Sequence, residues 1–86
     1  MPKFYEGDFV RVVEAPDLAK ALPHERVAWA KIEKDEVLYV KRARALRLEV
    51  CSFYARYKFW FPTTCLALIP EEEKDLYLAI WELQER

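Results

Sequence analysis

The residues best able to support nucleophilic catalysis are few and widely separated in this 86-residue chain. Cys51 adjoins Ser52, Cys65 lies further along, and His24 is the sole imidazole. Nucleophilic catalysis needs a nucleophile, a base within hydrogen-bond reach and a group that orients the base, and no spacing here joins all three. His24 follows a proline and precedes a glutamate, which favours a solvated loop position. We therefore predict that the protein is not an enzyme.

Metal and cofactor sites are not predicted either. Zinc is held by about four Cys or His ligands in close pairs, whereas this chain has two distant cysteines and one histidine. The run Glu71–Glu73 favours compensation of a helix dipole, because adjacent acids point in different directions around a helix. A single glycine cannot build a phosphate-binding glycine loop. We expect no metal, no small-molecule cofactor, and two buried thiols in a reducing compartment.

A basic and aromatic segment is the first candidate binding surface. Side chains of both kinds alternate along one side of an expected strand up to Trp60. If exposed, they set stacking rings beside cations, the combination that single-stranded nucleic acid prefers. The candidate set is Arg42, Arg44, Arg47, Tyr54, Arg56, Lys58 and Trp60. Alternatively, an acidic helix covers this side, with Trp60 in the core and Arg56 in a surface ion pair.

The charges are distributed unevenly along the chain. From Lys41 to Lys58, six basic residues and one acidic residue give +5, and from Pro70 to Arg86, two basic and six acidic residues give −4. The net charge of −1 therefore conceals a basic sheet region and an acidic terminal region. The isoelectric point near 5.8 argues against a dedicated nucleic-acid binder, which is usually basic overall.

Period-two patterning predicts several short strands. A Gly-Asp turn precedes a strand over 9–14, Asp17 can cap a helical turn over 18–22, and 37–40 is rich in strand-forming residues. The segment 27–32 fits either a strand or a short, poorly capped helix, and 42–45 is interpreted as a tight connection.

Two alternating runs follow, and their apolar positions are out of phase. Leu46, Leu48 and Val50 share one face, and the next run places Ala55, Tyr57, Phe59 and Phe61 on the apolar face. A shift of one residue reverses sidedness, so we predict a bulge or turn near 51–53.

The C-terminal segment predicts an amphipathic helix over 71–84. Pro70 suits the first turn, and the acids that follow favour the positive end of the dipole. Its apolar stripe is expected to cover an open side of the sheet or to form a homodimer seam. The candidate interface residues are Leu76, Ile80, Trp81 and Leu83.

Two segments resemble SH3-like barrels of the KOW and Tudor type. Gly7-Asp8-Phe9-Val10-Arg11-Val12 is similar to their first strand, and the run from Phe59 to Ile69 is similar to their last hairpin, with Pro62 before a short turn and a closing strand. The chain departs from the family in having no glycine after Gly7. The resemblance implies a binding module rather than an enzyme.

The sequence therefore predicts one domain, mainly β with added α: an SH3-like antiparallel barrel of about five strands over 1–69 and a helix over 70–86. The length suits one domain. The absence of Asn, with one Gln, is typical of thermophile proteins. We expect a cytoplasmic interaction module that binds a protein partner or a second copy of itself, with RNA or single-stranded DNA as the alternative and no membrane partner.

Overall fold

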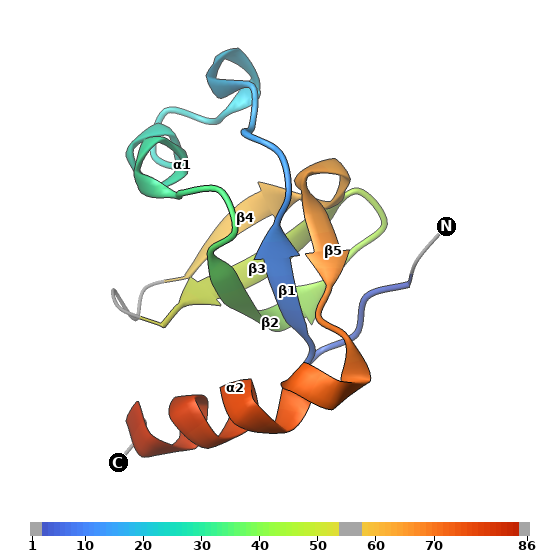
Figure 1. The fold of residues 1–86 in the computed structure, drawn as a ribbon. Coiled ribbons are helices and arrows are strands. Elements are labelled where there is room, and N and C mark those ends of the chain that lie inside the picture. The colour runs from blue at the N-terminus through green and yellow to red at the C-terminus, as the bar shows by residue number, and fades with distance from the viewer. Residues whose placement is uncertain (1–2, 54–57, 85–86) are drawn as a thin grey trace.

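The computed structural model describes residues 3–53 and 58–84 and shows a strongly curved antiparallel sheet with helices at both ends (Figure 1). The strands are β1 (Phe9–Val12), β2 (Val37–Ala43), β3 (Arg47–Ser52), β4 (Lys58–Pro62) and β5 (Leu66–Leu68). The helical elements are η1 (Leu18–Lys20), α1 (Arg26–Lys31), η2 (Thr63–Cys65) and α2 (Glu71–Gln84). All five strands form one sheet in the order β4-β3-β2-β1-β5. The predicted fold class, mainly β with an added C-terminal helix, is confirmed.

The main core lies on the inner face of this sheet. Leu48 pairs with Phe61 and Val50 with Phe59, so the alternating residues of β3 and β4 meet on one side. All four are buried in a cluster that also holds Trp29 of α1. The predicted faces are therefore correct for these residues and wrong for Leu46, which lies exposed in the turn before β3 because the strand begins one residue later.

The predicted change of phase occurs at the end of β3. This strand ends at Ser52, a turn begins at Phe53, and β4 resumes the ladder at Lys58. A register shift, which marks a bulge, also lies in β2 between Val40 and Arg42. The tight connection predicted over 42–45 begins two residues later than expected, because β2 stays paired to Ala43 and β3 starts at Arg47. The predicted positions Tyr54, Ala55, Arg56 and Tyr57 lie outside the described residues.

The ambiguous segment 27–32 belongs to the short helix α1. Its N-cap residue, Glu25, makes no side-chain capping bond, so tertiary burial must stabilise the helix. Trp29 supplies that burial, and its indole N–H donates a hydrogen bond of 2.7 Å to the carbonyl oxygen of Trp60. The preceding helical turn is η1, where Asp17 accepts a hydrogen bond from the backbone N–H of Ala19, as its capping role predicted.

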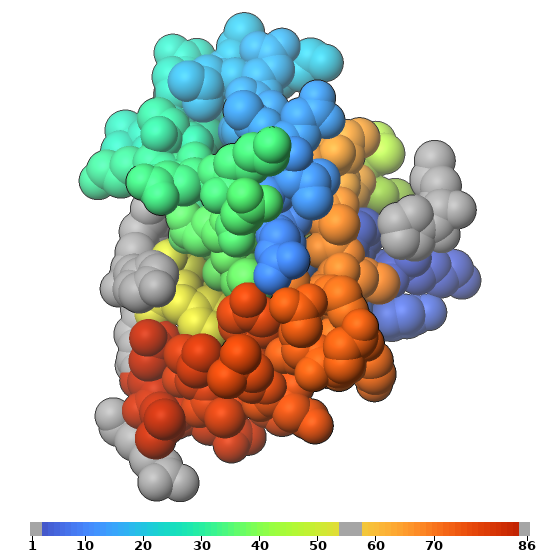
Figure 2. Space-filling model, in the orientation of Figure 1, coloured from blue at the N-terminus to red at the C-terminus, as the bar shows by residue number. Residues whose placement is uncertain are grey.

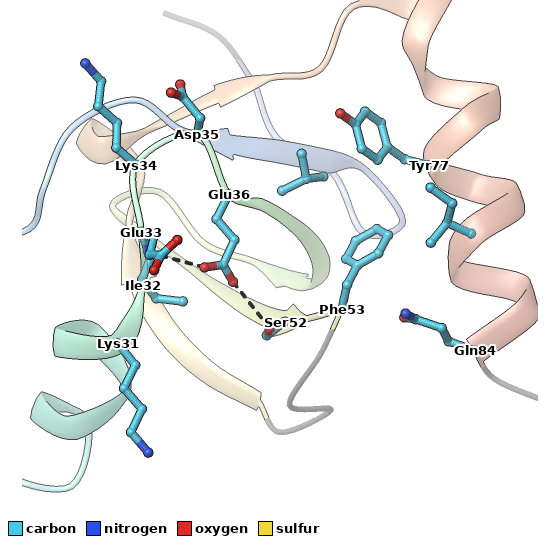
Figure 3. Close-up of a pocket in the computed structure, with 12 residues that line it drawn as sticks. Lys31, Ile32, Glu33, Lys34, Asp35, Glu36, Ser52, Phe53, Tyr77 and Gln84 are labelled. Carbon is cyan, nitrogen blue, oxygen red and sulfur yellow. Dashed lines mark hydrogen bonds between the residues drawn. The ribbon is translucent and has the colours of Figure 1, made fainter.

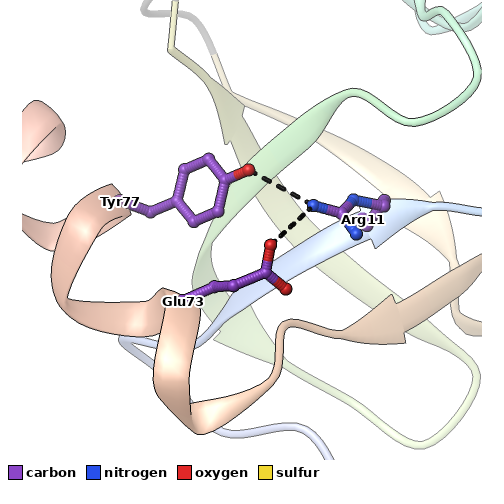
Figure 4. A network of polar contacts seen from close by, with 3 residues as sticks. All are labelled: Arg11, Glu73 and Tyr77. Atoms are coloured by element: carbon purple, nitrogen blue, oxygen red, sulfur yellow. Dashed lines mark hydrogen bonds and ion pairs between the residues drawn. The ribbon is translucent and has the colours of Figure 1, made fainter.

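The helix α2 packs on the outer face of the sheet through aromatic side chains. Trp81 is 7% exposed and stacks on Tyr39 of β2 with ring centroids 4.5 Å apart. Phe53 meets the same indole edge-on at 5.3 Å. Nearer the start of α2, the Arg11 guanidinium donates to the Tyr77 hydroxyl and lies 3.6 Å from the Glu73 carboxylate (Figure 4).

The apolar stripe expected to cover the sheet does so only in part. Leu76 and Leu83 are 61% and 69% exposed, whereas Trp81 is buried. The covering contacts come from the aromatic residues beside the stripe, because Tyr77 and Trp81 lie four positions apart and share the inward side of the helix. Trp81 is therefore a core residue, which is the packing on the chain's own sheet that the sequence offered beside a homodimer seam.

Candidate binding surfaces

The residues that could support catalysis, His24 and the two cysteines, differ in their exposure to solvent. The His24 side chain is 75% exposed and lies 3.5 Å from the Glu25 carboxylate. Both cysteines are buried thiols, and burial raises the pKa of the Cys65 thiol. A thiol whose pKa is raised is a poor nucleophile at neutral pH. Within residues 3–53 and 58–84, no group of three or more His, Cys, Asp or Glu side chains is placed to hold a metal ion.

One candidate surface is the outer side of β2, β3 and β4. Arg42 pairs with Glu49, and Glu49 with Trp60, so three neighbouring strands present these side chains on one face. The Arg42 Nε atom lies 3.6 Å from a Glu49 carboxylate oxygen. By alternation along β4, Lys58 points to the same side, whereas Arg47 lines another cavity with Glu14, Asp17 and Trp29. We call Arg42, Arg44, Lys58 and Trp60 the basic strand face.

A cation covers the aromatic ring of this face. The Arg44 guanidinium lies 5.7 Å from the ring centroid of Trp60, which is half-buried, while Lys58 is exposed. Among the described residues, Glu73 is the α2 residue whose carboxylate forms an ion pair. Its partner is Arg11, which does not belong to the basic strand face. The alternative in which the acidic helix covers this side stays a prediction, because α2 packs on the same outer face of the sheet through Tyr39. Tyr54 and Arg56 lie outside the described residues.

The second candidate surface is a groove of about 640 Å³ beside α2. One wall is the segment 31–37, the other is α2, and Phe53 lies between them (Figure 3). Figure 2 shows the hollow between the green segment and the red helix. We call this cavity the α2 groove. It is lined by Lys31, Ile32, Glu33, Lys34, Asp35, Glu36, Val37, Ser52, Phe53, Tyr77, Ile80 and Gln84.

The exposed stripe of α2 extends the apolar wall of this groove. Ile80 lines the cavity, and Leu76 and Leu83 lie four residues before and three residues after it, on the same flank of the helix. Both leucines are largely exposed, so the apolar surface runs from the cavity onto the shoulder of α2. The structure thus brings together three of the four predicted interface residues.

Sequence reasoning missed the wall opposite α2 and the residue between the walls. Ile32 and Val37 flank the charged run from Glu33 to Glu36, and this pair of apolar residues around a polar run was the available signal. Phe53 ends an alternating run, and nothing local placed it beside a helix some twenty-five residues later. A side-chain contact holds the wall: the Glu36 carboxylate accepts hydrogen bonds from the Ser52 hydroxyl at 3.3 Å and from the Glu33 backbone N–H at 3.2 Å.

Comparisons with protein-family models, curated proteins and solved structures found no match to this chain. The function is therefore inferred from the chemistry of the two surfaces. In the described part of the chain, no helix combines the length and the apolar character needed to cross a bilayer.

Proposed function

We propose that this protein is a non-catalytic binding module and that it holds a protein partner in the α2 groove. The observation that carries the proposal is the continuity of apolar surface from Phe53 and Ile80 inside the cavity to the exposed Leu76 and Leu83 outside it. Contiguous exposed apolar surface with a polar rim is typical of protein interaction sites. The groove also lies on rigid elements, since α2 is anchored by the buried Trp81.

The arrangement of the strands supports an SH3-like architecture as part of this proposal. The five antiparallel strands follow the order β4-β3-β2-β1-β5, and Pro62 and the short turn η2 precede the closing strand β5. The proline and the short turn before a closing strand are among the features on which the sequence resemblance depends. Such barrels serve widely as interaction modules, and fold alone does not name a partner.

Site-specific photo-crosslinking in cells tests the proposal. The crosslinker p-benzoylphenylalanine in place of Leu76 is expected to capture a discrete protein, because that position borders the groove. Leu78 is the matched control, since it is a leucine of the same helix, is 39% exposed and points to the other flank. Capture of the same proteins from both positions, or from neither, would contradict the proposal.

A second candidate function is binding of RNA or single-stranded DNA by the basic strand face. The specific observation in its favour is the Arg44 guanidinium over the Trp60 ring, with further cations on the same side of the sheet. Such surfaces combine stacking with phosphate attraction.

Fluorescence anisotropy with oligo(U) and oligo(dT) tests this second function. We expect affinity that falls steeply with salt and a loss of about 1–3 kcal/mol in Trp60→Ala. Arg44→Ala is the companion variant, because its side chain is exposed and its removal leaves the core intact. Salt-independent binding, or no binding at low salt, would reject this function.

A further inference from the structure

We propose that the occupant of the α2 groove is a basic amphipathic helix of a protein partner. This inference rests on the proposed function and adds the chemistry of the ligand. Three features of the groove support it: the charge of its walls, a buried oxygen that lacks a donor, and the shape of its apolar surface.

The walls of the groove are acidic. The segment 31–37 carries two basic and three acidic residues, a net charge of −1, and α2 carries one basic and five acidic residues, a net charge of −4. Two of these acids, Glu36 and Glu73, already have partners within the chain. On segment 31–37 the exposed Lys31 and Lys34 balance Glu33 and Asp35, so the excess negative charge at the rim comes from α2, where Glu72 lies one helical turn before Leu76 on the same flank. A cationic partner fits this rim better than an anionic one.

A buried acceptor lines the cavity wall. The side-chain oxygen of Gln84 is buried and has no hydrogen-bond partner among the described residues. A buried polar atom without a partner carries a desolvation cost, which a ligand donor removes when the amide of this half-buried side chain turns towards the groove. Lysine and arginine side chains supply only donors, so the cationic partner indicated by the rim also suits this oxygen.

The apolar surface has the dimensions of two helical turns. Leu76 and Leu83 are seven residues apart, which is about 10 Å along a helix axis. A partner helix with apolar residues at every third or fourth position can lie along this length and insert into the cavity at Ile80. An extended peptide is less suited, because the residues lining the groove include none from the sheet-edge strands β4 and β5.

Binding of two designed peptides tests the inference. The first has leucines on one helical face and lysines on the other, and the second keeps the leucines and replaces every lysine by glutamate. We expect the lysine peptide to bind with a salt-dependent affinity at least tenfold above that of the glutamate peptide. Leu76→Glu should weaken the binding of the lysine peptide at least tenfold, and the matched variant Leu78→Glu should leave it within twofold.

A charge-reversal variant makes the test specific for the rim. In Glu33→Lys with Glu72→Lys, both changes fall on exposed side chains, so the fold is expected to persist, and circular dichroism checks this. The preference between the two peptides should then shift towards the glutamate peptide by tenfold or more.

The remaining outcomes overturn the inference. Equal binding of the two peptides, or equal losses in the Leu76 and Leu78 variants, would reject a basic helix in the groove. Failure of both peptides to bind would do the same, and light scattering that shows a dimer disrupted by Leu76→Glu would assign the groove to a second copy. The crosslinking experiment separates these results from failure of the proposed function, because partner capture at Leu76 does not depend on the charge of the partner.

Discussion

Replacement of Trp81 by alanine tests how α2 is held on the sheet. The indole is 7% exposed and contacts two rings, those of Tyr39 and Phe53. Truncation of a buried tryptophan or phenylalanine costs about 3–5 kcal/mol, and each well-oriented aromatic pair contributes about 0.5–1.5 kcal/mol within that sum. At about 0.05–0.15 kcal/mol per residue, a chain of this length has a total stability of roughly 4–13 kcal/mol. The substitution should therefore remove a large fraction of the stability.

The assay is urea unfolding followed by circular dichroism, with hydrogen exchange of the α2 amides as a second readout. We expect Trp81→Ala to lower the free energy of unfolding by about 3 kcal/mol or more and to release α2 from protection. The control is Leu83→Ala in the same helix, which should change stability by less than about 0.5 kcal/mol, because that side chain is 69% exposed. A loss below about 1 kcal/mol in Trp81→Ala, with α2 still protected, would refute the packing described here.

Three further predictions concern stability and thiol chemistry. Glu25 is 3% exposed and neither carboxylate oxygen accepts a hydrogen bond among the described residues, so Glu25→Met should stabilise by about 1 kcal/mol in urea unfolding, and a loss of similar size would contradict this. Gly7 has φ of 90°, so Gly7→Ala should cost about 1–2 kcal/mol in the same assay, and no loss would contradict the turn. Burial raises the pKa of the Cys65 thiol, so its contribution is complete below the ordinary value of 9.0 and is lost as pH rises through the folded value. Stability should therefore fall on raising the pH above about 9, and this fall should be smaller in Cys65→Ala.

The strands and α2 were predictable because each follows a strong local period. The alternation of Leu48 with Val50 and of Phe59 with Phe61 places four core residues on one face, and the structure pairs them directly. The cap at Asp17 was predictable for the same reason, because its short side chain accepts a hydrogen bond from a backbone N–H only two residues later. These patterns can be recognised without knowing which distant segments of the chain pack against them.

The side of α2 that packs on the sheet was not predictable from its period alone. Leucines and aromatic residues lie on adjoining flanks of this helix, and both flanks read as apolar. The sheet selects the aromatic flank, because Tyr39 and Phe53 offer rings against which Tyr77 and Trp81 can pack. Tertiary contacts therefore determine which flank of α2 is buried, and the leucine flank stays exposed to solvent.

The α2 groove could not be predicted because its parts are distant in sequence. Ile32 belongs to the segment after α1, Phe53 follows β3, and Ile80 belongs to α2. The basic strand face was easier to find, since Lys58 and Trp60 alternate along the single strand β4 and Arg44 lies in the turn between β2 and β3. Its central acid, Glu49, was counted only as a charge, and the cross-strand register gives it a structural role.

The central claim is that this protein binds its partner in the α2 groove, and a chemical-shift titration measures this most directly. The ¹⁵N-labelled protein is titrated with the leucine–lysine peptide while its amide resonances are followed. The account predicts that the largest shifts fall on Ile32, Phe53, Ile80 and Gln84. Shifts confined to Arg44, Lys58 and Trp60, with the groove unmoved, would contradict it.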